Sequence, residues 1–245
     1  MTLDKSTNIV DEIIKIFKDE IHKVIDDNPD VFTEDILKIF DIKQFPNLVL
    51  YGNDLLWNKP RTTRYGLKQI RKSLIQYLDI WAYVPFKASM EYTIKDDKTN
   101  LKSLCVYINK DSLNETILDN IHRIDVLTEL VKIDARHEMG HMIDFIKSID
   151  LTPEEFQKRD ISDAQSKNEY YKWRREILDE YNKTEYSIEN ENKTNRMISE
   201  KYYNLPAEWR ADVLGRVDRQ AYLDLMYDTS MDQSIEIGAK NKEDK

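Results

Sequence analysis

The chain has 245 residues and a formal net charge of −9 at pH 7; 40% of its residues are hydrophobic and 34% are charged. This length allows one large domain or two small lobes with a sizeable core, and the acidic balance argues against nucleic acid as a partner. Five glycines and six prolines are few for the length, which favours long helices over many short strands.

The cysteine content and the hydropathy bear on the compartment. One cysteine, Cys105, excludes an intramolecular disulfide, and its apolar flanks predict a buried thiol in a strand. No apolar run approaches the roughly 20 residues of a membrane span, and residues 1–6 lead into an amphipathic pattern without a signal-peptide core. We therefore expect a cytoplasmic protein without a membrane partner. Export by a route without a signal peptide, or action inside a host cell, is the alternative.

The first third of the chain predicts helices and one strand. Apolar residues recur every three or four positions in residues 9–25, which predicts a helix over about 6–26. Residues 33–41 predict a short second helix, and residues 47–51 predict a strand.

A further helix is predicted over about 62–80, and basic side chains recur along it at helical spacing. On an acidic protein, such a stripe is either a solvated face that pairs with nearby acids or a dock for an acidic substrate segment or partner. The solvated face is the simpler interpretation. The stripe consists of Arg61, Arg64, Lys68, Arg71 and Lys72.

Two strands are predicted next, at residues 90–94 and 104–108, joined by a polar turn at 96–100. They precede a helix with an unusual pair of histidines. Two adjacent strands joined by a turn and followed by long helices predict an α+β fold that is predominantly helical.

The histidines belong to the pentapeptide His137-Glu138-Met139-Gly140-His141. On an α-helix, residues four apart lie about 40° apart around the axis and roughly 6 Å along it, so two imidazoles can converge on one ion. Glu138 then lies beside the metal without ligating it, as in the H-E-x-x-H arrangement whose Glu is a general base. The alternative is two exposed histidines beside a Glu. Apolar residues at helical spacing on both flanks favour a buried helix over about 122–148 instead.

Two segments follow this helix. Thr152-Pro153-Glu154-Glu155 is a strong helix start, with Thr as N-cap, Pro at N1 and Glu at N3. It predicts a helix over about 153–182 with an aromatic face in the core. The polar residues 183–195 predict a loop or frayed helix near the entrance of an active site.

A catalytic zinc site usually has three protein ligands and one open position, so a third ligand is needed. The two other histidines, His22 and His122, lie upstream, which leaves a carboxylate. Glu208 and Asp212 lie four apart in a predicted helix over 206–227 and so face the same way. Glu208 can ligate Zn²⁺ while Asp212 accepts the second N–H of a ligand histidine. The alternative for Glu208 is a solvated helix carboxylate.

The two motifs resemble those of the gluzincins, the thermolysin-like zinc peptidases with two His ligands and one Glu ligand. The forms His137-Glu138-Met139-Gly140-His141-Met142-Ile143-Asp144 and Ala207-Glu208-Trp209-Arg210-Ala211-Asp212 are similar to the anthrax lethal factor and Pro-Pro endopeptidase branch. The resemblance covers roughly residues 104–226. The chain departs from that branch at Asp212, where a Glu is usual, and over the long insert between the motifs.

The resemblance implies a zincin-like fold, with a small sheet packed on the motif helix, and one Zn²⁺ per chain held by His137, His141 and Glu208. It also implies that residues 103–110 form the sheet edge along which a peptide substrate lies, the alternative being an ordinary central strand. The expected single domain spans residues 1–232. It has a helical and sheet lobe at 1–120, a metal-site lobe at 121–232 and a disordered polar tail at 233–245.

Three further residues have roles that the resemblance leaves open. A Tyr closely precedes the Glu ligand in that branch, which makes Tyr202 and Tyr203 candidates for stabilising an oxyanion; packing is the alternative for each. Asp144 is expected to bind either a backbone amide or the loop of the second motif.

Together these features predict a zinc-dependent endopeptidase in which Glu138 accepts a proton from metal-activated water during attack on a protein or peptide. The alternative from a different class is a non-catalytic binding or structural protein that keeps the fold and its zinc site. A self-processing enzyme is a third possibility. Glu138 favours an enzyme, because a metal site without catalysis has no need of it.

Overall fold

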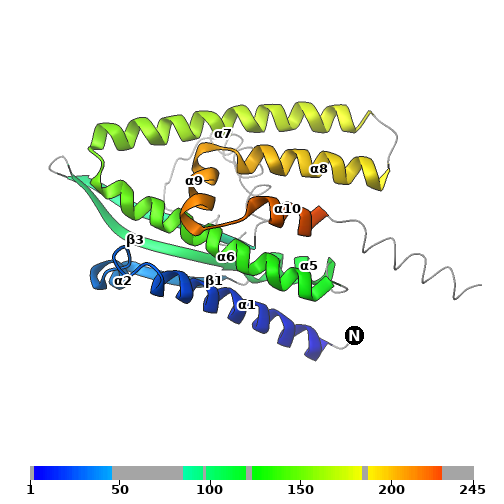
Figure 1. Ribbon diagram of the computed structural model, residues 1–245, viewed down its shortest axis with the longest axis horizontal. Coiled ribbons are helices and arrows are strands. Elements are labelled where there is room, and N and C mark those ends of the chain that lie inside the picture. Colours follow the sequence, from blue (N-terminus) through cyan, green and yellow to red (C-terminus); the bar gives the residue numbers. More distant parts are fainter. Residues whose placement is uncertain (1–2, 46–84, 96–97, 120–122, 184–186, 228–245) are drawn as a thin grey trace, which may run out of the picture.

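The computed structural model describes residues 3–45, 85–95, 98–119, 123–183 and 187–227, and helices dominate it (Figure 1). Three strands form one mixed sheet, so the expected α+β class is confirmed. The elements are α1 Leu3–Asp26, α2 Glu34–Ile39, β1 Phe40–Phe45, β2 Phe86–Lys95, β3 Lys98–Asn109, α5 Lys110–Asp119, α6 Ile124–Lys147, α7 Pro153–Tyr181, α8 Ile188–Tyr203, α9 Pro206–Gly215 and α10 Arg219–Tyr227.

The sheet has the strand order β1-β3-β2, with β1 parallel to β3 and β2 antiparallel to it. The predicted strands at 90–94 and 104–108 lie in the second halves of β2 and β3, and Cys105 is buried as expected. Placing residues 103–110 at the sheet edge is wrong, because β3 is flanked on both sides. The reason is β1, which the sequence did not reveal: helix α2 ends at Ile39 and the chain continues as a strand instead of completing the predicted helix at 41.

The main core lies between α1, the sheet and α6. The ring of Phe17 from α1 stacks on Phe86 from β2, with ring centroids 3.8 Å apart. Apolar side chains of α6 complete this core, which explains why its helical periodicity is readable in the sequence. The central members are Ile13, Phe17, Ile21, Leu104, Val106, Ile108, Met139, Met142 and Ile143.

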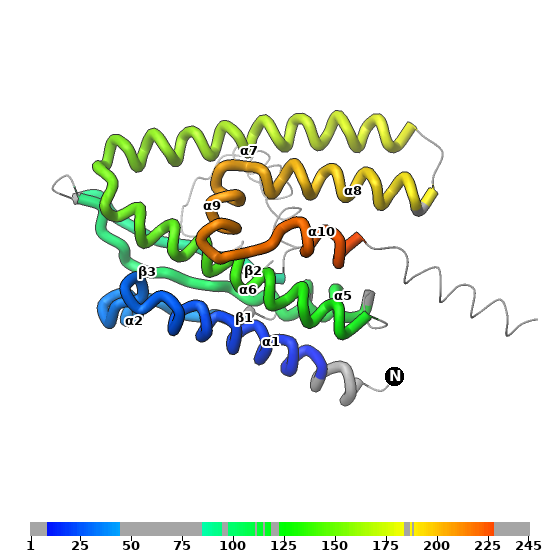
Figure 2. Tube along the Cα trace, in the orientation of Figure 1, coloured from blue at the N-terminus to red at the C-terminus, as the bar shows by residue number. Residues whose placement is uncertain are grey.

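Helices α7 and α8 form an antiparallel pair along one side of the molecule (Figure 2). The predicted capping box at the start of α7 is present, with the Thr152 hydroxyl accepting from the amide of Glu155. Of the two alternatives predicted for 183–195, a loop or a frayed helix, the chain is helical from residue 188 onward. Ser187 caps α8 there by accepting from the amide of Asn190. That start of α8 lies at the end of the helix pair remote from α9, the helix that carries Glu208 (Figure 2).

The predicted single helix over 206–227 is two helices. Helix α9 ends at Gly215, and Arg216 adopts a left-handed conformation with φ 55° and ψ 45°. The amide of Val217 closes this end by donating to the carbonyl of Asp212 at 2.9 Å. Helix α10 then starts at Arg219 in a new direction (Figure 1).

Several predictions lie outside the described residues: the strand at 47–51, the basic helix at 62–80 with its stripe, and the tail at 233–245. Within the described ranges, no helix combines the length and apolarity needed to cross a membrane.

Candidate metal centre

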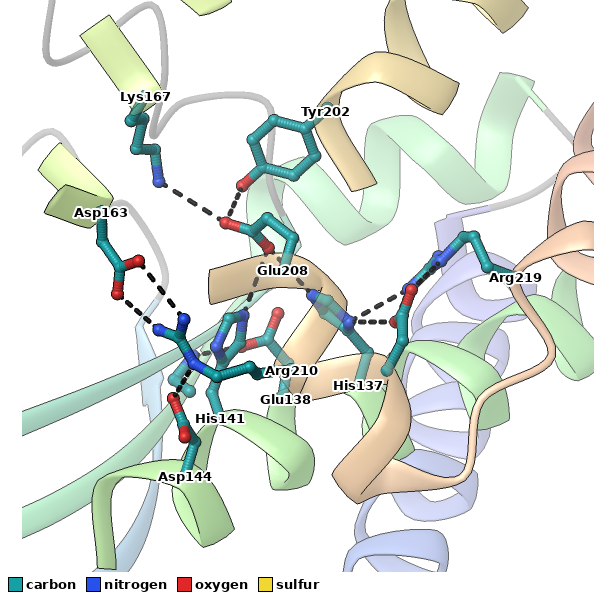
Figure 3. A network of polar contacts seen from close by, with 12 residues as sticks. His137, Glu138, His141, Asp144, Asp163, Lys167, Tyr202, Glu208, Arg210 and Arg219 are labelled. Atoms are coloured by element: carbon teal, nitrogen blue, oxygen red, sulfur yellow. Dashed lines mark hydrogen bonds and ion pairs between the residues drawn. The ribbon is translucent and has the colours of Figure 1, made fainter. Parts of the chain in front are cut away.

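The three predicted ligands lie together between α6 and α9 (Figure 3). The Oε2 atom of Glu208 lies 3.2 Å from Nε2 of His137 and 3.3 Å from Nε2 of His141. His137 and Glu208 are buried, with 6% and 5% of their surface exposed, and His141 is half-buried. The carboxylate of Glu208 therefore points at both rings and not into solvent.

The spacing of these atoms fits ligands around one ion. Zinc bonds to nitrogen and oxygen of roughly 2.0–2.1 Å place two ligands of a tetrahedron about 3.3–3.4 Å apart. A direct charge-assisted N–H···O bond is shorter, at about 2.7–2.9 Å. The two N···O distances of 3.2 and 3.3 Å are closer to the first value. Two imidazoles and one carboxylate are also the donor set of many catalytic zinc sites.

Two glycines allow the ligand-bearing helices to approach so closely. A Cβ atom on Gly140 would lie 1.9 Å from the carbonyl oxygen of Ala211, and one on Gly215 would lie 2.2 Å from that of Arg136. The backbones of α6 and α9 are therefore in direct contact at two places. This contact brings Glu208 within reach of the histidines, and it gives Gly140 of the first motif a physical reason.

Asp212 holds the second nitrogen of His137, as the sequence predicted for a ligand histidine. Its Oδ1 lies 2.7 Å from Nδ1 of His137. A proton on Nδ1 leaves the lone pair of Nε2 directed toward the ligand cluster. Burial opposes ionisation of Asp212, but hydrogen bonds from Arg219 and His137 outweigh it and lower the pKa of Asp212. Arg219 was not identified from the sequence.

We expect Asp212→Asn to weaken zinc binding by about 10- to 100-fold, the usual effect of removing a hydrogen-bond partner of a ligand histidine. The asparagine keeps the size of the side chain but loses the charge that orients and polarises His137. Competition with a chromophoric chelator measures the dissociation constant. An unchanged constant would show that Asp212 has no influence on the metal.

The second oxygen of Glu208 has different neighbours. The Tyr202 hydroxyl donates to Oε1 at 2.8 Å, and Nζ of Lys167 lies 3.7 Å from the same atom (Figure 3). Lys167 comes from α7 and had no role in the sequence interpretation. Of the two tyrosine candidates, Tyr202 thus has its hydroxyl at the ligand cluster.

Tyr203 packs against His137 of the ligand cluster. Its ring meets the ring of His137 edge-on, with centroids 5.7 Å apart, and that of Tyr222 with centroids 5.8 Å apart. The guanidinium carbon of Arg219 lies 3.5 Å from the ring centroid of Tyr203. These contacts fit the packing alternative for Tyr203.

Glu138 lies on the sheet side of the histidines. Its Oε2 accepts a short hydrogen bond from the backbone amide of Ala88 in β2. The side chain is half-buried and lies beside the ligand cluster, and Glu138 is not among the three residues whose ligand atoms converge (Figure 3). This is the place that the sequence predicted for a residue that acts next to a metal without binding it.

Asp144 joins three helices. Its Oδ2 accepts from Nη2 of Arg159 in α7 at 2.6 Å and from Nε of Arg210 in α9 at 3.2 Å. Arg210 also pairs with Asp163 of α7. Of the two predicted alternatives, the second motif is therefore the partner of Asp144, through Arg210. Arg159 and Asp163 were not identified from the sequence.

We expect the pH dependence of the stability of the metal-free protein to be set in part by His137 between about pH 6.5 and 9. Burial opposes protonation of His137, but hydrogen bonds to Asp212 and Glu208 outweigh it and raise the pKa from 6.5 to about 9. The folded protein then binds this proton more tightly than the unfolded chain does. The resulting stabilisation is complete below pH 6.5 and disappears as the pH rises through 9.

The measurement is the midpoint of thermal unfolding against pH in the presence of chelator, for wild type and His137→Gln. Wild type and variant are compared because Lys87 has the opposite effect on the pH dependence of stability. Burial, followed by the charge of Lys167, lowers the pKa of Lys87 to about 7. The advantage of wild type over His137→Gln should shrink from pH 6.5 to 9. A constant or growing advantage would contradict the raised pKa.

Comparison with known proteins bears on the resemblance to gluzincins. No family model matches the chain, and no curated protein or solved structure matches it. The resemblance therefore rests on the two motifs and on the geometry of their side chains.

Proposed function

We propose that the protein is a zinc-dependent endopeptidase with a zincin-like catalytic site. The observation that carries this proposal is the convergence of His137, His141 and Glu208 with Glu138 at their side. A purely structural zinc site is usually closed by four protein ligands. Here, among the described residues, the cluster offers three. Three ligands leave a position for a reacting molecule.

The metal and the residues of the chain have separate roles in the proposed reaction. When bound, zinc supplies a water nucleophile near neutral pH and a Lewis acid for a carbonyl oxygen. Glu138 accepts the proton of the attacking water and delivers it to the nitrogen that leaves the cleaved peptide bond. The Tyr202 hydroxyl donates a hydrogen bond to the oxyanion that develops on the carbonyl oxygen. The hydroxyl lies at the ligand cluster, and its single proton would turn from Oε1 of Glu208 to the oxyanion.

An extended peptide fits the edge of β2, in place of the predicted edge at 103–110. In the described part of the sheet, β3 flanks β2 on one side only. On the other side the amide of Ala88 points at Glu138. Alternate residues of a strand direct their backbone groups the same way, so Phe86 and Met90 share this edge. A substrate strand pairing there lies beside the proposed base.

Cleavage of a peptide library by the zinc-loaded protein tests the proposal. We expect cleavage products from the loaded protein, none after removal of zinc by a chelator, and recovery when zinc is restored. Zinc binding without any cleavage would contradict the peptidase proposal and favour a non-catalytic zinc protein. Cleavage that persists in full without metal would contradict the zinc mechanism.

A further inference from the structure

The three metal ligands alone do not account for how the buried carboxylate of Asp212 is stabilised. Its side chain is 9% exposed, and its Oδ1 faces Nδ1 of His137. An imidazole that binds metal through Nε2 is neutral, so it offers Asp212 one hydrogen bond but no positive charge. A buried carboxylate without a compensating charge is strongly unfavourable. A second, permanently charged partner would stabilise the Asp212 carboxylate and fix its orientation beside a metal-bound His137.

Arg219 is that partner. Its Nε lies 2.9 Å from Oδ2 of Asp212, and its Nη2 makes a shorter bond to Oδ1. Nη2 and Nδ1 of His137 lie 3.0 Å apart, so both donors share the same carboxylate oxygen. Arginine suits this place because its planar fork holds both oxygens of a carboxylate at once and never loses its charge.

Aromatic rings fix the guanidinium from behind. Its central carbon lies 3.5 Å from the ring centroid of Tyr203 and 4.5 Å from that of Tyr222. Only 13% of the Arg219 side chain is exposed. Stacking of a desolvated guanidinium on ring faces is attractive, so the rings both hold the charge and limit its movement.

The path of the chain is what makes this contact possible. In an unbroken helix, Arg219 would lie seven residues, or about 10.5 Å, beyond Asp212 along the axis. The left-handed Arg216 ends α9 and redirects the chain, so the first residue of α10 returns to Asp212. The break that separates the predicted helix 206–227 into two therefore has a role at the metal centre.

We propose that Arg219 is a positioning residue that sets zinc affinity through Asp212 and His137, without touching the metal itself. It holds both carboxylate oxygens of Asp212 in one orientation, and Asp212 in turn keeps the lone pair of His137 directed at the ion. This inference rests on the metal site of the proposed function but not on peptide cleavage. The competing interpretation is that Arg219 only ties α10 to α9.

A double-mutant cycle on zinc affinity separates the two interpretations. Arg219→Met is expected to raise the zinc dissociation constant by about 10- to 100-fold in the wild-type background. In the Asp212→Asn background the same substitution is expected to change it less than about threefold, because the pathway is already interrupted. Arg219→Lys should recover part of the affinity, since it keeps the charge but loses the fork.

Arg196→Met is the matched control. Arg196 of α8 pairs with Asp224 of α10 at 2.7 Å, so it ties the same helix down without contacting Asp212. We expect it to leave zinc affinity unchanged. Equal losses from Arg196→Met and Arg219→Met, or an undiminished effect of Arg219→Met in the Asp212→Asn background, would overturn the positioning role.

Two further outcomes are distinguishable. If Arg219→Met does not fold by circular dichroism, the cycle is run with Arg219→Lys, whose smaller loss must still vanish in the Asp212→Asn background. Zinc binding by wild type with an additive cycle overturns this inference and leaves the proposed function standing. Failure of wild type to bind zinc overturns both.

Discussion

Replacement of Glu138 by glutamine is expected to lower kcat/KM for peptide cleavage by about 10²- to 10⁴-fold, the usual contribution of a general base. Glutamine has the shape of glutamate, and its amide oxygen can still accept from the Ala88 amide as Oε2 does now. It cannot take a proton from water at neutral pH. Zinc content should be unchanged, because Glu138 lies beside the ligand cluster and is not part of it. Steady-state kinetics with metal analysis of the same preparation measures both.

The matched control is Glu129→Gln, on the same helix. Glu129 is exposed and pairs with Lys132, so its loss should change neither cleavage nor zinc content. Wild-type cleavage by Glu138→Gln would remove the general base from the mechanism. Loss of zinc from Glu138→Gln would show instead that Glu138 supports the metal, and the role given to it here would be wrong.

Gly140→Ala is expected to destabilise the fold by about 2 kcal/mol or more, in the range seen when extra atoms are forced into a packed site. The added Cβ would lie 1.9 Å from the carbonyl oxygen of Ala211. That atom is backbone, so relief requires α6 and α9 to separate. For a chain of this size, the midpoint of thermal unfolding should fall by about 4–8 °C. Zinc affinity should fall as well, because separation moves Glu208 away from His137.

The sign of this effect makes it diagnostic. In an exposed helix interior, Gly→Ala normally stabilises by about 1 kcal/mol through helix propensity. A rise in the unfolding midpoint of Gly140→Ala would therefore contradict the close contact of α6 and α9. Gly215→Ala provides a second variant at the same crossing, since its Cβ would lie 2.2 Å from the Arg136 carbonyl oxygen. Both variants should move in the same direction.

The features that could be predicted from the sequence have short-range causes. The histidines of the first motif lie one turn apart, so helical geometry alone makes them neighbours. The capping box at Thr152 involves side chains and amides within four residues. The apolar repeats of α1 and α6 each form one face of the core. In each case the residues involved lie within a few helical turns of one another, so the local sequence pattern predicts them.

The features that were missed depend on contacts between distant segments. Strand β1 owes its form to parallel pairing with β3, more than sixty positions later along the chain. Because the sequence does not predict β1, it predicts β3 as an edge strand, whereas β3 is the central strand. The break after Gly215 lies where α9 contacts α6, and the return of Arg219 depends on that break. No local sequence pattern predicts contacts between such distant segments.

The candidate site shows the same division. Glu208 and Asp212 could be selected because they lie four apart and follow a histidine motif that lacked a third ligand. Lys167 of α7 and the Ala88 amide of β2 reach the site through the tertiary fold. Nothing in the local sequence predicts that Lys167 or the Ala88 amide lies near the candidate metal site, so only the structure shows their positions.

The zinc dissociation constant of wild type and of Glu208→Gln tests the metal centre most directly. Glutamine keeps the size of the ligand but removes the charge that zinc prefers, and neutral amides are poor zinc ligands compared with carboxylates. We expect one zinc per chain in wild type and at least about 100-fold weaker binding in Glu208→Gln. Equally tight binding by the two proteins would mean that zinc is held elsewhere, and the site formed by His137, His141 and Glu208 would not be a metal centre.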